Sequence, residues 1–190
     1  MQVKPLLTNS GIPFDGSQQE VPQLFTPRVV NDERGFFFES WNQRTFPYPV
    51  TFVQDNHSRS SRGVIRGLHY QLPPHAQAKL VRCVVGEILD VAVDLRRSSS
   101  TFAHWVSVRL DAVDHQQLWV PEGFAHGFLS LSNPAEVLYK TTDFWSKECE
   151  RTVFWDDPQL DIFWEEKLKF SAKDAAAPLL TQCEPGDLFP

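Results

Sequence analysis

The 190-residue sequence contains no apolar run that approaches the roughly 20 residues of a membrane-spanning helix. Its first residues, Met-Gln-Val-Lys-Pro-Leu-Leu, also lack the apolar stretch and the small-residue cleavage site of a signal peptide. Cysteine is scarce: there are three, an odd number without the spacing of a metal site, which we interpret as reduced thiols. We therefore expect a cytoplasmic protein without a membrane partner.

Charge and glycine patterns argue against further classes. The net charge is -6, whereas a general nucleic-acid-binding protein needs a basic surface, so we expect no nucleic-acid partner. None of the nine glycines falls into the dinucleotide-binding or phosphate-loop pattern. The Gly-x-Ser-x-Gly turn of hydrolases is also missing. Nicotinamide chemistry and hydrolase-type acyl transfer both become less favoured.

Aromatic residues and turn residues are abundant, with 15 Phe, 6 Trp, 14 Pro and 9 Gly. Apolar residues alternate with a period of two through residues 81–144, and no helical pattern separates the predicted strands. Residues 81–85 and 89–95, joined by Gly86-Glu87, are predicted to form a hairpin. The pattern indicates a mainly β fold, a sandwich or jelly roll.

The length predicts a single domain over residues 1–190. Residues 1–25 are polar and contain proline, which predicts an N-terminal arm that packs on another surface, such as a partner subunit. Residues 41–46 are a candidate for one helical turn. Residues from about 156 to 190 are predicted to be irregular, with a short helix over 171–177 that ends before Pro178.

The most informative stretch is Arg62-Gly-Val-Ile-Arg-Gly-Leu-His-Tyr-Gln71. Its β-branched and aromatic residues predict a strand. Gly63 and Gly67 indicate a bend or a close approach of another group to the backbone. Charged side chains on such a strand serve a ligand or a partner surface, although an edge strand with solvated arginines is an alternative.

The segment Pro121-Glu-Gly-Phe-Ala-His126 matches the turn that delivers a histidine into the barrel of cupin-type jelly rolls. A cupin metal site also needs a His-x-His pair on an earlier strand, and the matching segment is His69-Tyr-Gln71. The amide oxygen of Gln71 is a poor ligand for the usual transition metals. We therefore expect neither a metal nor a cofactor, and a hydrogen-bonded core histidine is the alternative for His126.

Six segments of the chain resemble the dTDP-4-dehydrorhamnose 3,5-epimerase family. They are Asp32-Glu-Arg-Gly-Phe-Phe-Phe-Glu39, Gln54-Asp-Asn56, Arg62 to Gln71, Pro121 to Phe128, Leu138-Tyr-Lys-Thr-Thr-Asp143 and Phe170-Ser-Ala-Lys-Asp174. The resemblance implies a metal-free cupin-type jelly-roll sandwich, usually a homodimer. It implies an epimerase that inverts C3 and C5 of dTDP-4-dehydro-6-deoxy-D-glucose, which leads to dTDP-L-rhamnose.

The resemblance also implies the catalytic residues. They are the base His69, its partner Asp174, Lys79 near the C4 oxygen of the sugar, and the acid Tyr139 on the opposite face. The strand parity of Tyr139 fits an inward-pointing side chain. Each residue also has a structural alternative: a paired core side chain for Tyr139 or His69, a helix cap for Asp174, and a solvated lysine for Lys79.

The family's substrate-binding positions match Arg34, Phe37, Glu39, Gln54, Asn56, Arg66, His126, Trp145, Glu150 and Lys173. The two arginines suit a diphosphate, because a guanidinium group forms paired hydrogen bonds with phosphate oxygens. The two aromatic residues are candidates for stacking on the base. Trp145 stands where the family commonly has tyrosine, so stacking is kept and a hydroxyl group is lost.

The position of Arg66 is geometrically awkward. It has the opposite strand parity to His69, so the two side chains would not line one wall in a regular strand. A subunit interface, across which Arg66 reaches a neighbour's site, is one resolution.

Three other functions are compatible with parts of the pattern. A single-carbon epimerase of a related dTDP-4-keto-deoxysugar would use the same base, acid and lysine. A non-catalytic sugar-nucleotide-binding jelly roll would keep Arg34 and Arg66 but would need neither His69 nor Tyr139. A metal-dependent cupin oxygenase is disfavoured by Gln71.

Overall fold

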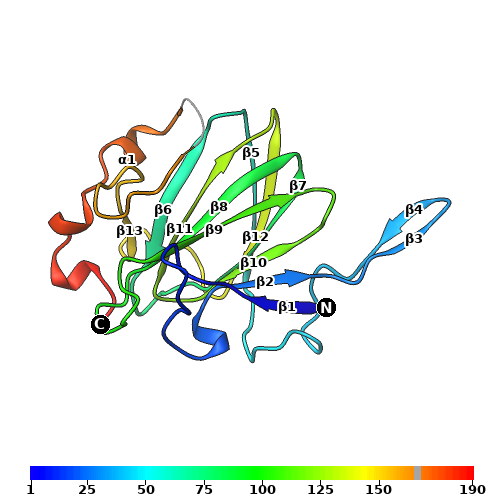
Figure 1. Cartoon of the computed structure of the whole chain (residues 1–190), viewed down its shortest axis with the longest axis horizontal. Helices are drawn as coiled ribbons and strands as arrows, with labels where there is room; N and C mark the ends of the chain where they lie inside the picture. Colours follow the sequence, from blue (N-terminus) through cyan, green and yellow to red (C-terminus); the bar gives the residue numbers. More distant parts are fainter. Residues whose placement is uncertain (165–167) are drawn as a thin grey trace.

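The computed structural model describes residues 1–164 and 168–190, so three residues of the predicted C-terminal segment lie outside it. Two β-sheets face each other and form a jelly-roll sandwich, which confirms the predicted mainly β fold with short flanking helices (Figure 1). None of the helices in the described residues is long and apolar enough to cross a membrane.

The larger sheet has six strands in the order β1-β2-β10-β7-β12-β5. They are β1 (Gln2–Pro5), β2 (Gln23–Thr26), β10 (Gln117–Val120), β7 (Lys79–Val85), β12 (Ala135–Thr141) and β5 (Gln54–Ser60). The second sheet has five strands in the order β13-β6-β11-β8-β9. They are β13 (Glu150–Thr152), β6 (Ile65–Gln71), β11 (Phe124–Ser130), β8 (Glu87–Asp94) and β9 (Trp105–Asp111).

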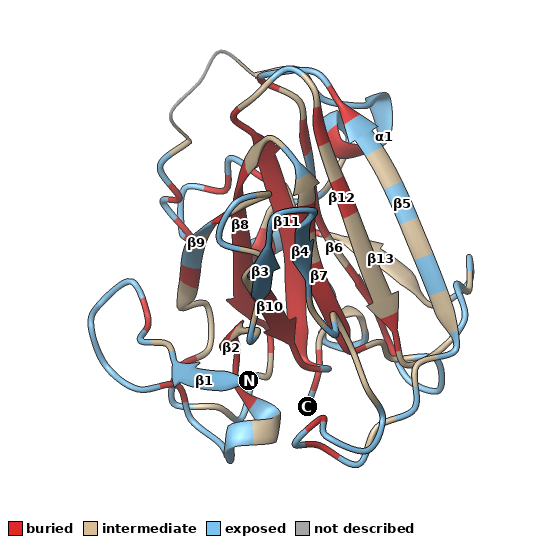
Figure 2. Ribbon diagram, turned by 90° about the vertical axis from the view of Figure 1, so that its right-hand side faces the viewer, coloured by how far each residue is buried: buried red, intermediate tan, exposed pale blue. Residues whose placement is uncertain are grey.

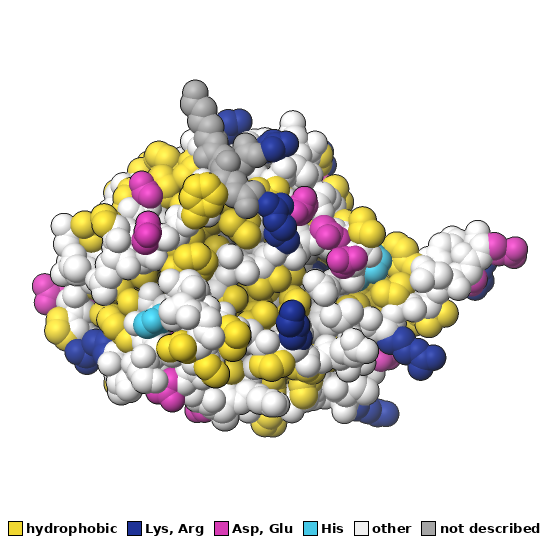
Figure 3. Space-filling view, viewed as in Figure 1, with side chains coloured by type: hydrophobic (Ala, Val, Ile, Leu, Met, Phe, Trp, Pro, Cys, Tyr) yellow, Lys and Arg dark blue, Asp and Glu magenta, His cyan; other side chains and the backbone are white. Residues whose placement is uncertain are grey.

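The remaining elements are short. They are the strands β3 (Val30–Asp32) and β4 (Gly35–Phe37), the helix α1 (Ala172–Ala175) and the 3₁₀ turns η1 (Gln18–Glu20), η2 (Leu180–Gln182) and η3 (Pro185–Asp187). The hairpin of β3 and β4 projects from the body of the molecule (Figure 1). Figure 3 shows charged side chains at its tip and hydrophobic side chains near its base.

Apolar side chains cover both faces of each sheet. One cluster, which includes Val81 and Phe128, fills the space between the sheets. A second, which includes Leu68 and Leu180, packs the C-terminal segment on the outer face of the five-stranded sheet. A third, around Trp119, covers the outer face of the six-stranded sheet. Strands β8, β10 and β11 are buried along most of their length, whereas β5 is partly exposed (Figure 2). Alternate residues of a strand therefore point into two different apolar clusters, and not into the core on one face and solvent on the other.

The predicted hairpin of residues 81–85 and 89–95 is wrong. Strand β7 pairs with β10 and β12, while β8 pairs with β9 and β11, so the chain passes from one sheet to the other at Gly86. A Cβ atom at Gly86 would lie 1.9 Å from the Ser132 hydroxyl oxygen, so the crossing is tightly packed. Alternation identifies a strand but not its partner.

Part of the predicted N-terminal arm packs on its own chain. Strand β1 pairs with β2, and Phe14 and Val21 join the cluster between the sheets. The candidate helical turn at residues 41–46 is a hydrogen-bonded turn, in which the amides of Thr45 and Phe46 donate to the carbonyl of Asn42. A helix lies within the predicted range 171–177 but is shorter: α1 spans Ala172–Ala175, with Ser171 as its N-cap and Ala176 as its C-cap.

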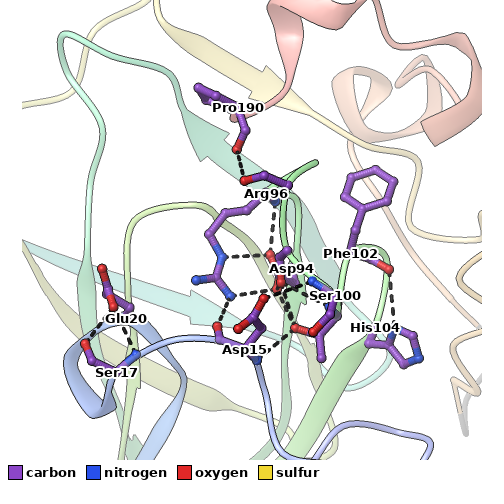
Figure 4. A network of polar contacts seen from close by, with 12 residues as sticks. Asp15, Ser17, Glu20, Asp94, Arg96, Ser100, Phe102, His104 and Pro190 are labelled. Carbon is purple, nitrogen blue, oxygen red and sulfur yellow. Dashed lines mark hydrogen bonds and ion pairs between the residues drawn. The ribbon is translucent and has the colours of Figure 1, made fainter.

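A polar network holds the loop after β8 (Figure 4). Asp94 is completely buried, and both of its carboxylate oxygens accept hydrogen bonds. The donors are Arg96, Ser99 and Thr101. Arg96 also donates to the carbonyl of Asp15, which ties the N-terminal residues to this loop. A buried carboxylate with this many donors is a structural anchor.

Candidate active site

A cavity of about 580 Å³ lies between the two sheets. Its lining comes from β5, β7 and β12 on one side, from β6, β11 and β13 on the other, and from residues 169–174 at the mouth. All four predicted catalytic residues line it: His69, Lys79, Tyr139 and Asp174. The sandwich therefore brings together groups that lie up to 105 residues apart in the sequence.

The predicted base and its partner form a hydrogen bond. His69 Nε2 lies 2.6 Å from Asp174 Oδ1. Burial alone would raise the pKa of Asp174, but hydrogen bonds from His69 and Ser171 outweigh it and lower the pKa. The carboxyl group therefore stays ionised beside the imidazole. Because Nε2 is used, Nδ1 is the ring nitrogen through which His69 can take a proton from a ligand.

A β-bulge places Arg66 and His69 on the same wall. His69 pairs with His126, but Arg66 pairs with Phe128, so β6 has one residue more than β11 between the two pairs. Gly67 permits the bulge: its φ is +140°, and an added Cβ would lie 2.5 Å from the Cα of Gly127. The parity argument is thus wrong, because it assumes a regular strand. Arg66 lines the cavity of its own chain.

Two cation-forming side chains are buried beside His69. The amine of Lys79 donates to the carbonyl oxygen of His69 at 3.2 Å. Burial lowers the pKa of Lys79 to about 8, although the charge of Asp90 opposes this shift. His126 Nε2 lies 2.5 Å from Asp90 Oδ1, and burial lowers the pKa of His126 against the opposing effect of Asp90.

Tyr139 faces the cavity from the opposite sheet. It lies on β12, whereas His69 lies on β6, so the two side chains approach the cavity from its two walls. Burial raises the pKa of Tyr139, and the charge of Arg66 opposes this shift only in part. The hydroxyl group therefore stays protonated at neutral pH and can serve as a proton donor.

Most predicted substrate-binding residues also line the cavity: Gln54, Asn56, Arg66, His126, Trp145, Glu150 and Lys173. Gln54 donates to Asn56 at 3.0 Å and accepts from the backbone amide of Trp145. Lys173 and Glu150 form an ion pair of 2.6 Å across the mouth. The indole of Trp145 is more than half exposed, so one of its faces is available for stacking.

Three predicted residues are missing from the described lining: Arg34, Phe37 and Glu39. Arg34 and Phe37 belong to the projecting hairpin, and the Arg34 side chain is 85% exposed and paired with Asp32. Phe37 is 71% exposed. Glu39 accepts a hydrogen bond from Asn42. Their own chain does not bring these residues to the cavity.

Gln71, which occupies the second metal-ligand position of a cupin, uses its amide to hold two loops. Its oxygen accepts from the backbone amide of Ser146, and its nitrogen donates to the carbonyls of His75 and Phe144. Within the described ranges, no group of three or more His, Cys, Asp or Glu side chains is placed to hold a metal ion.

Sequence reasoning missed several residues of the cavity and its base: Gln77, Asp90, Phe128, Phe170 and Ser171. Asp90 left a signal, because a carboxylate interrupts the apolar pattern of β8 at a position that faces the other sheet. Ser171 left one as well, since the cap that it forms is readable from the sequence. Its hydroxyl donates to Asp174 at 2.9 Å and so also holds the partner of His69.

Known proteins share this architecture. Residues 20–182 match the family model described as dTDP-4-dehydrorhamnose 3,5-epimerase. A dTDP-4-dehydrorhamnose 3,5-epimerase of Pseudomonas aeruginosa is 63% identical over 145 residues, which are 74% of this chain and 80% of that protein.

Two solved structures give the likeness in three dimensions. A dTDP-6-deoxy-D-glucose-3,5-epimerase of Legionella pneumophila, in complex with dTDP-4-keto-L-rhamnose, superposes with a TM-score of 0.85 at 43% identity and covers 93% of this chain and 96% of its own. A 3'-monoepimerase of Streptomyces bikiniensis in complex with dTDP superposes with a TM-score of 0.84 at 31% sequence identity, and the match covers 92% of this chain and 91% of that one. On this evidence the chain belongs to the dTDP-4-dehydrorhamnose 3,5-epimerase family.

Proposed function

We propose that this protein inverts C3 and C5 of dTDP-4-dehydro-6-deoxy-D-glucose and yields dTDP-4-dehydro-L-rhamnose, by means of the four residues His69, Asp174, Lys79 and Tyr139. The observation that carries the proposal is their arrangement in one cavity. A carboxylate-backed imidazole enters from one sheet, a protonated phenol enters from the other, and a buried lysine lies beside the imidazole.

The chemistry follows from the acidity of a C–H bond next to a ketone. His69 takes the proton from the ring carbon, and the electron pair moves onto the C4 oxygen to form an enolate. A well-placed base of this kind contributes roughly 10²–10⁴-fold. Lys79, when protonated, stabilises the oxygen anion. Tyr139 then donates its proton to the opposite face of the same carbon, which inverts it. His69 loses its proton to solvent and the Tyr139 phenolate regains one from solvent before the same steps invert the second carbon.

Asp174 acts through His69. It fixes the ring with Nε2 toward the carboxylate and stabilises the imidazolium that forms when Nδ1 takes the proton. Arg66 is the group that we assign to the diphosphate, because a guanidinium group at a cavity wall can donate several hydrogen bonds to phosphate oxygens. Trp145 is assigned to stacking on the thymine, and Glu150 and Lys173 to polar contacts at the mouth.

A homodimer would explain why Arg34, Phe37 and Glu39 match substrate-binding positions but do not line the cavity of their own chain. The β3–β4 hairpin carries Arg34 and Phe37 away from the body and exposes Val30, Phe36 and Phe37. An exposed apolar surface of this kind on a projecting element is typical of an interaction site. We assign its occupant as a second copy of the chain, whose cavity receives Arg34.

The same proposal includes the domain organisation and the cellular location of the enzyme. The chain acts as a single domain, because the C-terminal segment packs on the outer face of the five-stranded sheet and supplies Asp174 to the cavity. A cytoplasmic location agrees with its three free cysteines, Cys83, Cys149 and Cys183.

Proton exchange tests the proposed reaction directly. The protein is incubated with dTDP-4-keto-6-deoxyglucose in deuterium oxide, and exchange at C3 and C5 is followed by NMR. We expect deuterium at both carbons and inversion of both, and a His69→Ala variant should show neither while it still binds dTDP. Exchange at a single carbon would favour a one-carbon epimerase, the activity of the Streptomyces bikiniensis relative. No exchange at either carbon would refute the proposal.

A further inference from the structure

Asp90 is a buried carboxylate at the base of the cavity that none of the roles above uses. Its residue is 0% exposed, and Oδ1 accepts from His126 Nε2 at 2.5 Å. The other oxygen, Oδ2, has no hydrogen-bond partner among the described residues. Burying a carboxylate is costly unless it is fully paired, so this residue needs a physical reason.

Asp94 supplies the comparison. It lies on the same strand, faces the same side and is equally buried, but both of its oxygens are held by Arg96 and neighbouring hydroxyl groups (Figure 4). Asp94 therefore shows how a buried carboxylate with a structural role is paired in this fold: both of its oxygens accept hydrogen bonds. Asp90 lacks such a set of donors in the described part of the chain, and its one hydrogen-bond partner there, His126, lines the cavity. The two carboxylates therefore differ in purpose.

The partner, His126, is placed for contact with a ligand. It is the direct cross-strand neighbour of His69, and it lines the same cavity. Its Nε2 is used by Asp90, whereas Nδ1 has no partner in the described ranges. A neutral imidazole that donates through Nε2 has an acceptor at Nδ1. In that state His126 can accept a hydrogen bond from a hydroxyl group but cannot donate to a phosphate oxygen.

Burial is the main cause that lowers the pKa of His126 and so favours its neutral state, against the opposing charge of Asp90. Asp90 on β8 attracts a proton to the ring, whereas Lys79 on β7 and His69 on β6 oppose it, and the ring is almost fully buried. The other charged residues that line the cavity are the ion pair of Glu150 on β13 with Lys173 on α1, together with Arg66, Lys169 and Asp174. Lys79 also supplies a positive charge near Asp90, so the carboxylate does not need a protonated imidazole.

We propose that Asp90 is a positioning residue, which fixes His126 with Nε2 inward and so presents Nδ1 as an acceptor for a hydroxyl group of the bound sugar. The inference rests on the proposed function for the identity of the ligand, but it does not depend on which carbons are inverted. Asp90 acts through His126 and does not touch the substrate.

Steady-state kinetics of Asp90→Asn test this coupling. The variant keeps the shape of the side chain and removes the charge that selects the tautomer. We expect KM to rise about 10- to 100-fold, by analogy with the loss when the hydrogen-bond partner behind a metal-ligating imidazole is removed, with kcat changed by less than about three-fold. Rates are compared near pH 6, because the missing charge also affects the pKa of Lys79.

Two controls separate positioning from structure. In a His126→Gln background, Asp90→Asn should add less than about a two-fold change in KM, because the residue through which it acts is gone. Asp94→Asn should lower the melting temperature and leave KM unchanged. Independent, multiplicative losses from Asp90→Asn and His126→Gln would overturn the proposal, and so would an unchanged KM in Asp90→Asn.

Nitrogen NMR of the histidine side chains keeps the proposal testable if Asp90→Asn does not fold. In the wild-type protein at neutral pH, we expect His126 to carry its proton on Nε2 and none on Nδ1. Saturation with dTDP-L-rhamnose should shift Nδ1, and dTDP, which has no hexose hydroxyl groups, should not. A proton on Nδ1, or equal shifts with both ligands, would overturn the proposal. Neither measurement needs turnover, so this outcome is independent of the exchange experiment above.

Discussion

The pKa of Lys79 depends on a balance between burial, which lowers it, and nearby negative charge, which raises it. An ordinary lysine is protonated well above neutral pH, but burial lowers the pKa of Lys79 to about 8. A lysine with this pKa is still mainly protonated at pH 7, so it can stabilise an enolate oxygen. It also loses its proton within the range of pH in which the enzyme can be assayed.

We therefore expect kcat/KM to fall on the alkaline side with a midpoint near pH 8. The sign follows from the role of Lys79: the protonated form is active, so activity is present below the lowered pKa and is lost as pH rises through it. Measuring kcat/KM from about pH 6 to about pH 9.5 checks this. Lys79→Met should lose about 10²–10³-fold in kcat, and its kcat/KM should no longer fall near pH 8. A wild-type profile that stays flat across the range would contradict the assignment.

Tyr139 allows the two faces of the sugar ring to be tested separately. Tyr139→Phe removes one oxygen atom and keeps the ring that packs between the sheets. His69 should still remove a proton and return a deuteron to the same face, so deuterium enters with the original configuration. We expect inverted product to be scarce. The readout is NMR of the sugar after incubation in deuterium oxide, and inversion at the wild-type rate would remove Tyr139 from the mechanism.

Residue identities were predictable from the sequence where a segment carried a recognisable order of residues. His69, Tyr139 and Asp174 lie in such segments, whereas Lys79 was named only from the family resemblance, and all four line the cavity. Asp90 was not predicted, because a strand pattern says which residues share a face but not what the face meets. Its face meets the opposite sheet, so a residue that resembled a solvated aspartate is completely buried.

At the scale of elements, the bulge in β6 decides how the active site is built. It changes the parity of the strand between Arg66 and His69. Ile65 and Leu68 then point to the outer apolar cluster, while Arg66 and His69 point into the cavity. Gly67 signalled a bend in the sequence, but an extra residue in one strand becomes visible only when the partner strand is known.

Gly67→Ala should therefore damage both stability and activity. The substitution places a Cβ atom 2.5 Å from the Cα of Gly127 and requires an alanine at a φ of +140°. We expect a loss of about 2–5 kcal/mol in the free energy of unfolding, from overpacking and backbone strain together. Denaturant unfolding measures it. Gly186→Ala is the matched control, because a Cβ there meets nothing within 4 Å, and it should change the free energy by less than about 0.5 kcal/mol.

The pairing of strands was the least predictable feature. Alternation located β7 and β8 correctly, but the short turn between them suggested a hairpin, and they belong to opposite sheets. In a jelly roll, short connections cross between sheets as well as along them. The apolar run of β8 faces the C-terminal segment, which is distant in sequence, so no local pattern could reveal what covers it.

For the whole molecule, the projecting hairpin makes a prediction about assembly. If Arg34 completes the cavity of a second copy, then a dimer of one Arg34→Ala subunit and one His69→Ala subunit has one intact site. That site combines His69 from the first subunit with Arg34 from the second. Co-expression with two different affinity tags isolates this mixed dimer.

We expect about half of the wild-type activity per mixed dimer, while each homodimeric variant is strongly impaired at low substrate concentration. A mixed dimer without activity would mean that Arg34 serves its own chain. A monomeric wild-type protein, measured by light scattering, would contradict the assembly as a whole.

The position of Asp174 has a consequence for how the protein is made. Every strand of the sandwich is complete by Thr152, whereas the carboxylate that orients His69 follows 22 positions later on α1. A ribosome that has released the strands but still holds α1 in its exit tunnel therefore carries a chain whose His69 has no carboxylate to orient it. An oriented base is therefore present only once α1 has left the tunnel, so a growing chain that stops before Asp174 cannot use His69 in this way on a sugar nucleotide.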